Sequence, residues 1–124
     1  MPGRVYSCNS GDAQALKKLL EYDPYLDNTV TPEQLNKIKD DVMANVIFAR
    51  QDYQLKDGIS LGLDRGKYYL YLSAVDDFFE NAEKKLKQGI PSITRVDQEL
   101  EAKVIATLEG ERKESEEGLG LIFG

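Results

Sequence analysis

The sequence contains no histidine, no tryptophan and only one cysteine. Without histidine, the chain has neither the serine–histidine and cysteine–histidine pairs of many hydrolases nor the usual ligand of transition metals. One cysteine excludes an internal disulfide framework and fits a reducing compartment. We therefore expect a cytoplasmic protein that uses no cofactor and no metal. The absence of histidine and of a complete catalytic constellation argues against an enzyme, although it does not decide the question.

Long hydrophobic runs and an excess of basic residues are also missing. No apolar stretch is long enough to cross a bilayer, and residues 1–12 do not resemble a secretory signal. The formal net charge is −6, which disfavours a nucleic-acid partner because phosphate binding depends on Lys and Arg. The expected partner is another protein or a second copy of the chain in a homodimer, with no nucleic acid and no membrane.

Turn signals and apolar periodicity predict a single α+β domain over residues 1–117, with an apolar tail over residues 118–124. About four helices are expected to cover a small antiparallel sheet. Their predicted starts are near Gly11, at Thr31, near Ser73 and near Asp97. The second start is well defined, because Pro32 follows Thr31 at the first helical position and Gln34 completes a capping box.

The sheet is expected to be a three- to four-stranded meander. Residues 4–8 alternate as a first strand, and turns at Asp57-Gly58 and at Asp64-Arg65-Gly66 separate further extended segments. Those segments are 46–54, 59–63 and 67–73. The competing interpretation continues the helix of Thr31 as far as Gly58, because apolar residues keep a helical period over this stretch.

Each predicted helix has an apolar face. The helix after Thr31 presents Leu35, Ile38 and Val42. The helix after Ser73 ends at Gly89 and presents Val75, Phe78, Phe79, Ala82 and Leu86. The last helix presents Leu100, Val104, Ile105 and Leu108, and residues 109–117 then contain nothing that a core would hold.

Two features suggest chemistry and also have simpler explanations. Cys8 lies just before a helix N-terminus, which favours a reactive thiolate, but Gln14 stands where a cysteine phosphatase loop has its arginine. We expect a buried structural thiol. The acids Asp76, Asp77 and Glu80 have a spacing that suits a hard cation, yet acids in a first helical turn are also favoured by the helix dipole. We expect a solvated face.

Tyrosines crowd the segment 67–73. Tyr69 and Tyr71 share one face of the strand, while Tyr68 joins Leu70 and Leu72 on the other. The pair offers contact surface for a partner or a planar ligand, together with Arg50 or Tyr53 from a neighbouring segment.

The tail closes with four large apolar residues, Leu119, Leu121, Ile122 and Phe123. We expect them to be buried, either on their own domain, with a slight preference, or in a second copy, or in another protein. Gly118 and Gly120 are expected to give the chain an elbow there.

The predicted function is a small interaction or assembly module that self-associates or docks through this tail and the tyrosine face. The alternative is a small-molecule-binding protein or enzyme, with a pocket formed by Tyr69, Tyr71, Arg50 and Cys8 and with Tyr53 nearby. No motif set in the chain identifies a family.

Overall fold

A four-stranded antiparallel sheet forms the centre of the computed structural model, which describes residues 2–123 and the side chains of residues 2–113. The strands are β1 (Gly3–Asn9), β2 (Asp52–Asp57), β3 (Lys67–Ser73) and β4 (Thr94–Arg95). Their order is β2-β3-β1-β4, so the first strand of the chain lies between the β2–β3 hairpin and the short edge strand β4. The predicted α+β class is confirmed.

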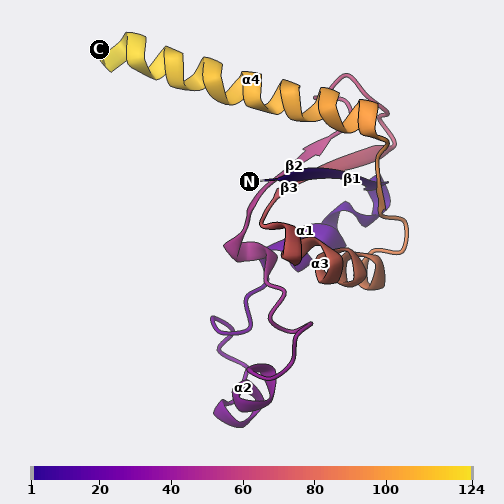
Figure 1. Cartoon of the computed structure of the whole chain (residues 1–124), viewed down its shortest axis with the longest axis vertical. Helices are drawn as coiled ribbons and strands as arrows, with labels where there is room; N and C mark the ends of the chain where they lie inside the picture. Colours follow the sequence, from indigo (N-terminus) through magenta and orange to yellow (C-terminus); the bar gives the residue numbers. More distant parts are fainter. Residues whose placement is uncertain (1, 124) are drawn as a thin grey trace.

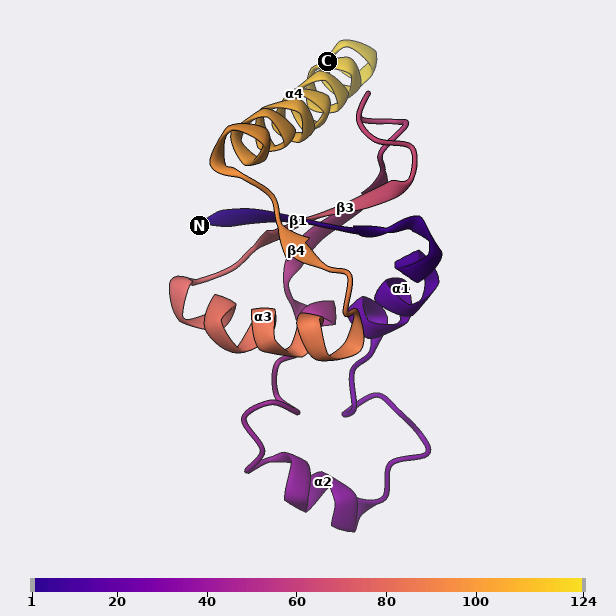
Figure 2. The same cartoon turned by 90° about the vertical axis from the view of Figure 1, so that its right-hand side faces the viewer.

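Helices cover both faces of the sheet (Figures 1 and 2). The helices α1 (Ala13–Glu21) and α3 (Asp76–Gly89) pack on one face, and α4 (Gln98–Phe123) crosses the other. The remaining helix, α2 (Pro32–Ile38), lies away from the sheet, at the end of a long excursion. Single 3-10 turns at Ser10–Asp12 and at Phe48–Arg50 (η2) lead into α1 and β2.

Alternation along the strands sorts the side chains into two cores. The larger core lies between the sheet and the helices α1 and α3, and contains Tyr6, Cys8, Leu16, Leu20, Phe48, Leu70, Leu72, Phe79, Ala82 and Leu86. The smaller core lies under α4 and contains Val5, Tyr69, Tyr71, Val104 and Leu108. The predicted split of Tyr69 and Tyr71 from Leu70 and Leu72 is therefore confirmed.

The helix α2 shows why a correct start signal does not ensure a buried face. The capping box of Thr31 and Gln34 forms as predicted. The helix nevertheless ends at Ile38, and none of its residues is buried; Val42, expected on its apolar face, is 66% exposed. The chain turns instead at Asp41, whose carboxylate accepts from the amides of Met43 and Ala44. The competing long helix to Gly58 is therefore wrong.

Two parts of the predicted meander are wrong: the segment 59–63 is not a strand, and the strand predicted at 46–54 lies instead at Asp52–Asp57, after the 3-10 turn of Phe48–Arg50. The Asp57 carboxylate accepts from the amide of Ser60 at 2.8 Å, and the amide of Leu63 donates to the carbonyl of Gly58 at 2.7 Å. These bonds wind residues 58–66 into one loop between β2 and β3. Leu61 and Leu63 still contribute to the fold, because both pack against the smaller core under α4.

The start of one helix and the end of another differ from the prediction. Ser73 belongs to β3 rather than capping the next helix, so α3 begins at Asp76, and Val75 is 60% exposed. At the other end of the chain, the backbone of α4 is helical through Gly118 and Gly120 to Phe123. The predicted burial of Leu119, Leu121, Ile122 and Phe123 lies outside the described side chains. Within the described part of the chain, no helix has both the length and the apolarity needed to cross a membrane.

Candidate functional site

The four residues of the predicted pocket do not come together. Tyr69 and Tyr71 are 5% and 8% exposed and lie beneath α4, so the tyrosine face is covered by the chain's own helix. Cys8 is buried on the opposite face of the sheet. Burial raises the pKa of its thiol, and the Asp12 carboxylate adds to this effect. Cys8 is therefore held as a protonated core side chain.

Arg50 is used within the fold. Its Nε and Nη2 donate to the Asp23 carboxylate at 2.9 and 3.3 Å, and its guanidinium lies 5.1 Å from the centre of the Tyr25 ring. The hydrogen bond from Arg50 lowers the pKa of Asp23. These contacts fix the base of the excursion that carries α2, where Lys85 of α3 also donates to the carbonyls of Met43 and Val46.

The acidic cluster at the start of α3 is solvated. Asp76, Asp77 and Glu80 are all exposed, and Glu80 lies 3.8 Å from Lys84 in an i,i+4 pair. Among the described residues, no group of three Asp, Glu, Cys or His side chains is arranged to hold a metal ion.

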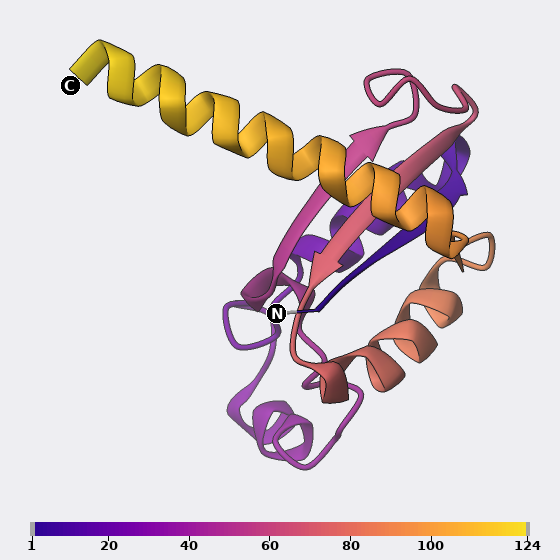
Figure 3. The same cartoon turned by 45° about the horizontal axis from the view of Figure 1, so that its top comes forward.

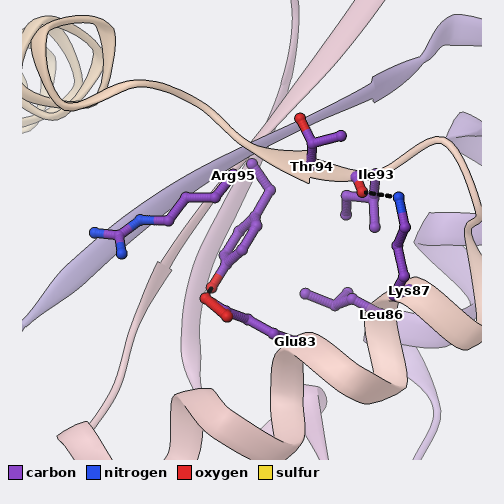
Figure 4. Close-up of a pocket in the computed structure, with 7 residues that line it drawn as sticks. Glu83, Leu86, Lys87, Ile93, Thr94 and Arg95 are labelled. Carbon is purple, nitrogen blue, oxygen red and sulfur yellow. Dashed lines mark hydrogen bonds between the residues drawn. The ribbon is translucent and has the colours of Figure 1, made fainter.

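A groove of about 290 Å³ lies between α3 and β4 (Figure 4). Tyr6 lines it, and the Tyr6 hydroxyl donates to Glu83 at 2.9 Å. Arg4 donates to the same Glu83 oxygen at 2.6 Å, with its guanidinium 4.6 Å from the centre of the Phe79 ring. Burial raises the pKa of Tyr6, and the Glu83 carboxylate raises it further, so the phenol stays protonated.

The polar groups of this groove therefore bind one another. Lys87, at the far end, donates to the carbonyl of Ile93 at 3.0 Å (Figure 4), and Arg95 turns away to pair with Glu101. Neither a nucleophile nor a base is left poised at Tyr6 or Glu83. The contacts join α3 to β1 and to Ile93, which directly precedes β4, and this role is structural.

Glu101 is a residue that reasoning from the sequence missed. It is 8% exposed and accepts hydrogen bonds from Arg95 and from the amide of Val5. One signal was present: Glu101 precedes Val104 and Leu108 by three and seven positions, so it lies on the buried stripe of the helix.

The edge strand β2 forms the remaining candidate surface, because among residues 2–123 only β3 pairs with it in the sheet. Tyr53 and Leu55 pack partly against the larger core and line a groove of about 220 Å³ with Lys17, Leu20 and Glu21 of α1. On the other face, Arg112 of α4 donates to the Asp52 carboxylate at 3.1 and 3.4 Å. When the side-chain amide of Gln54 is oriented with its oxygen toward α4, this oxygen accepts hydrogen bonds from Nη2 of Arg112 at 2.7 Å and from Nε at 2.8 Å.

Beyond this contact, α4 continues past the edge of the sheet (Figures 1 and 3). Two features thus meet at β2: an open strand edge and a helix that projects over it. No protein-family model, curated protein or solved structure matches this chain.

Proposed function

We propose that this chain is a small assembly module that associates with a second copy of itself at the β2 side of the sheet. The observation that carries the proposal is the course of α4. The helix crosses the sheet, is tied to β2 by Arg112, and continues to Phe123 past the last strand (Figure 3). A helix that served only its own sheet would need no such extension.

The sequence of the extension supports the proposal. It ends in the apolar residues Leu119, Leu121, Ile122 and Phe123. Burying one such side chain is favourable by about 1.5–3 kcal/mol, so a partner surface that covers several of them gains appreciable affinity. Closed, two-fold pairing of identical chains is the commonest form of assembly. The tyrosine face takes no part in the proposed contact, because α4 covers Tyr69 and Tyr71.

We also propose that this module is located in the cytoplasm. Its support is the single cysteine, Cys8, which is a free thiol in the core and fits a reducing compartment.

Sedimentation equilibrium tests the proposal. We expect the full chain to show a dimer mass and a melting temperature that rises with concentration. A chain in which Leu119, Leu121, Ile122 and Phe123 are all replaced by Ser keeps its length, and we expect it to be a monomer or a far weaker dimer. The matched control replaces the exposed Glu109 and Glu111 by Gln, which leaves the apolar residues in place. A full chain that stays monomeric at every concentration contradicts the proposal.

A further inference from the structure

The outer edge of β2 has a pattern that complements itself. The strand runs Asp-Tyr-Gln-Leu-Lys-Asp over Asp52–Asp57, and all six residues pair with β3. Asp52 and Gln54 face α4, where Arg112 binds them, so Lys56 shares that face. Tyr53 and Leu55 face the larger core. One face of β2 therefore presents the polar residues Asp52, Gln54 and Lys56, and the other face presents Tyr53 and Leu55, followed by Asp57 at the end of the strand.

We propose that β2 pairs antiparallel with β2 of a second copy, with Gln54 on the two-fold axis, so that one sheet runs through both copies. This inference rests on the proposed function and names the contact that carries it. Asp52 then lies opposite the partner's Lys56, and Tyr53 lies opposite the partner's Leu55. The two-fold axis makes each of these pairs twice.

Charge and apolar matching select this register. A two-fold axis must pass through a residue position, because directly opposite residues share one face of the sheet and the axis leaves each residue on its own face. An axis at Tyr53 places Asp52 opposite the partner's Gln54 and forms no ion pair. An axis at Leu55 places Tyr53 opposite the partner's Asp57 and forms no ion pair. With the axis at Gln54, opposite charges meet and apolar side chains meet, since residues directly opposite in an antiparallel pair share one face.

Two further features fit the same pairing. Proline, a bulge or a very short length can protect an exposed edge from pairing, and β2 has none of these, because its six residues pair with β3 in unbroken register and none is proline. Charged side chains also protect edges, and the proposed register brings Asp52 and Lys56 into pairs of opposite charge. The groove of about 220 Å³ beside Tyr53 and Leu55 lies next to the edge, where an apolar side chain of the partner has room. Because the axis passes through a residue position, both α4 helices lie on the same face of the joined sheet, and each projects toward the other copy.

Complementary charge variants test the register. In Lys56→Glu, the introduced glutamate faces the partner's Asp52; in Asp52→Lys, the introduced lysine faces the partner's Lys56. We expect each variant alone to self-associate at least about tenfold more weakly than the unchanged chain, because each repulsion occurs twice. Mixing the two variants restores attractive pairs between unlike copies, so native mass spectrometry of the mixture should show the heterodimer in excess over either homodimer.

Matched controls separate charge from position. Lys84→Glu makes the same charge change on the exposed face of α3, and Arg112→Ala reports the loss of the contact that Asp52→Lys also removes. When either control variant is mixed with Asp52→Lys, we expect no excess of the heterodimer over the homodimers. Amides of residues 52–57 should also exchange more slowly as concentration rises, which is measurable in the unchanged chain without any variant.

The outcomes distinguish this inference from the proposed function. A dimer that is unaffected by Lys56→Glu and Asp52→Lys, and that shows no concentration-dependent protection at residues 52–57, overturns the β2 pairing and leaves self-association standing. A mixture that forms no excess of heterodimer, although each variant alone is weakened, overturns the register. An unchanged chain that is monomeric overturns both the pairing and the proposed function.

Discussion

The guanidinium of Arg95 binds both carboxylate oxygens of Glu101, from Nε at 2.9 Å and from Nη2 at 2.7 Å. The same carboxylate accepts the amide of Val5 at 2.9 Å. One buried acid thereby joins β1, the edge strand β4 and the first turn of α4. Because α4 reaches β2 only if this first turn is fixed, the pair also orients the helix that the proposed assembly depends on.

Glu101→Gln is expected to lower the free energy of unfolding by about 1–3 kcal/mol at neutral pH, since hydrogen bonds to a charged group are lost. The Arg95 hydrogen bonds hold the pKa of Glu101 below its ordinary value, against the opposing effect of burial. A lowered pKa in the folded state adds stability above the unfolded value, about 4.3, and this stability is lost as pH falls through the folded value.

The difference between the unchanged chain and Glu101→Gln should therefore shrink as the pH falls below about 4, as measured by urea unfolding at a series of pH values. Glu99→Gln, at an exposed position in the same helical turn, is the control and should change stability by less than about 0.5 kcal/mol. A loss at Glu101 that is equally large in acid and at neutral pH would show that packing, and not the charged pair, is responsible.

Phe79→Ala is expected to cost about 3–5 kcal/mol, because the ring is 1% exposed in the larger core and Arg4 stacks on it. Phe78 is only partly buried, with its ring edge-to-face against Phe48, so Phe78→Ala should cost less. Asp77→Ala, in the exposed first turn of α3, should stay within about 0.5 kcal/mol. Thermal or urea unfolding gives this ranking directly, and similar losses at both phenylalanines would contradict the described packing of α3.

Cys8 should react slowly with a thiol reagent in the native protein, because the side chain is 2% exposed and burial raises the pKa of its thiol. The rate of colour release from an aromatic disulfide measures this, and unfolding in urea should restore the rate of a free thiol. Fast labelling near pH 6 would indicate a stabilised thiolate instead. Dimer formation should not depend on Cys8, which lies in the core.

The sequence predicted those features that local chemistry decides. Alternation assigned Tyr69 and Leu70 to opposite faces, and the Thr31 capping box marked the start of α2. The sequence did not show which surface covers each face, because that depends on contacts between distant segments. Val5 and Glu101 are 96 positions apart, and periodicity alone cannot tell that an acid on an apolar stripe has a partner there.

The error at residues 59–63 has a local cause. The alternation of Ile59, Leu61 and Leu63 resembles a strand, but the side chain of Asp57 captures the amide of Ser60 and starts a loop. Side chains that bond nearby amides compete with sheet pairing, and a hydrophobic pattern does not register them. Tyr69 and Tyr71 are covered for a different reason: the apolar stripe of α4 packs on their face of the sheet, and helical periodicity does not show which face a helix covers.

Substitution of Gly58 tests whether the loop of residues 58–66 supports the smaller core under α4. A β-carbon at this position would lie 1.8 Å from the carbonyl oxygen of Asp64, a backbone atom that cannot move aside cheaply. Gly58→Ala is therefore expected to cost about 1–3 kcal/mol or more through overpacking. Gly11→Ala is the matched control, because a β-carbon there meets nothing within 4 Å, and its effect should be small.

Since Leu61 and Leu63 of the same loop pack under α4, Gly58→Ala should also speed amide exchange around Val104 and Leu108 while leaving α3 protected. Equal stability of the two alanine variants, by urea unfolding, would mean that the loop does not turn as described.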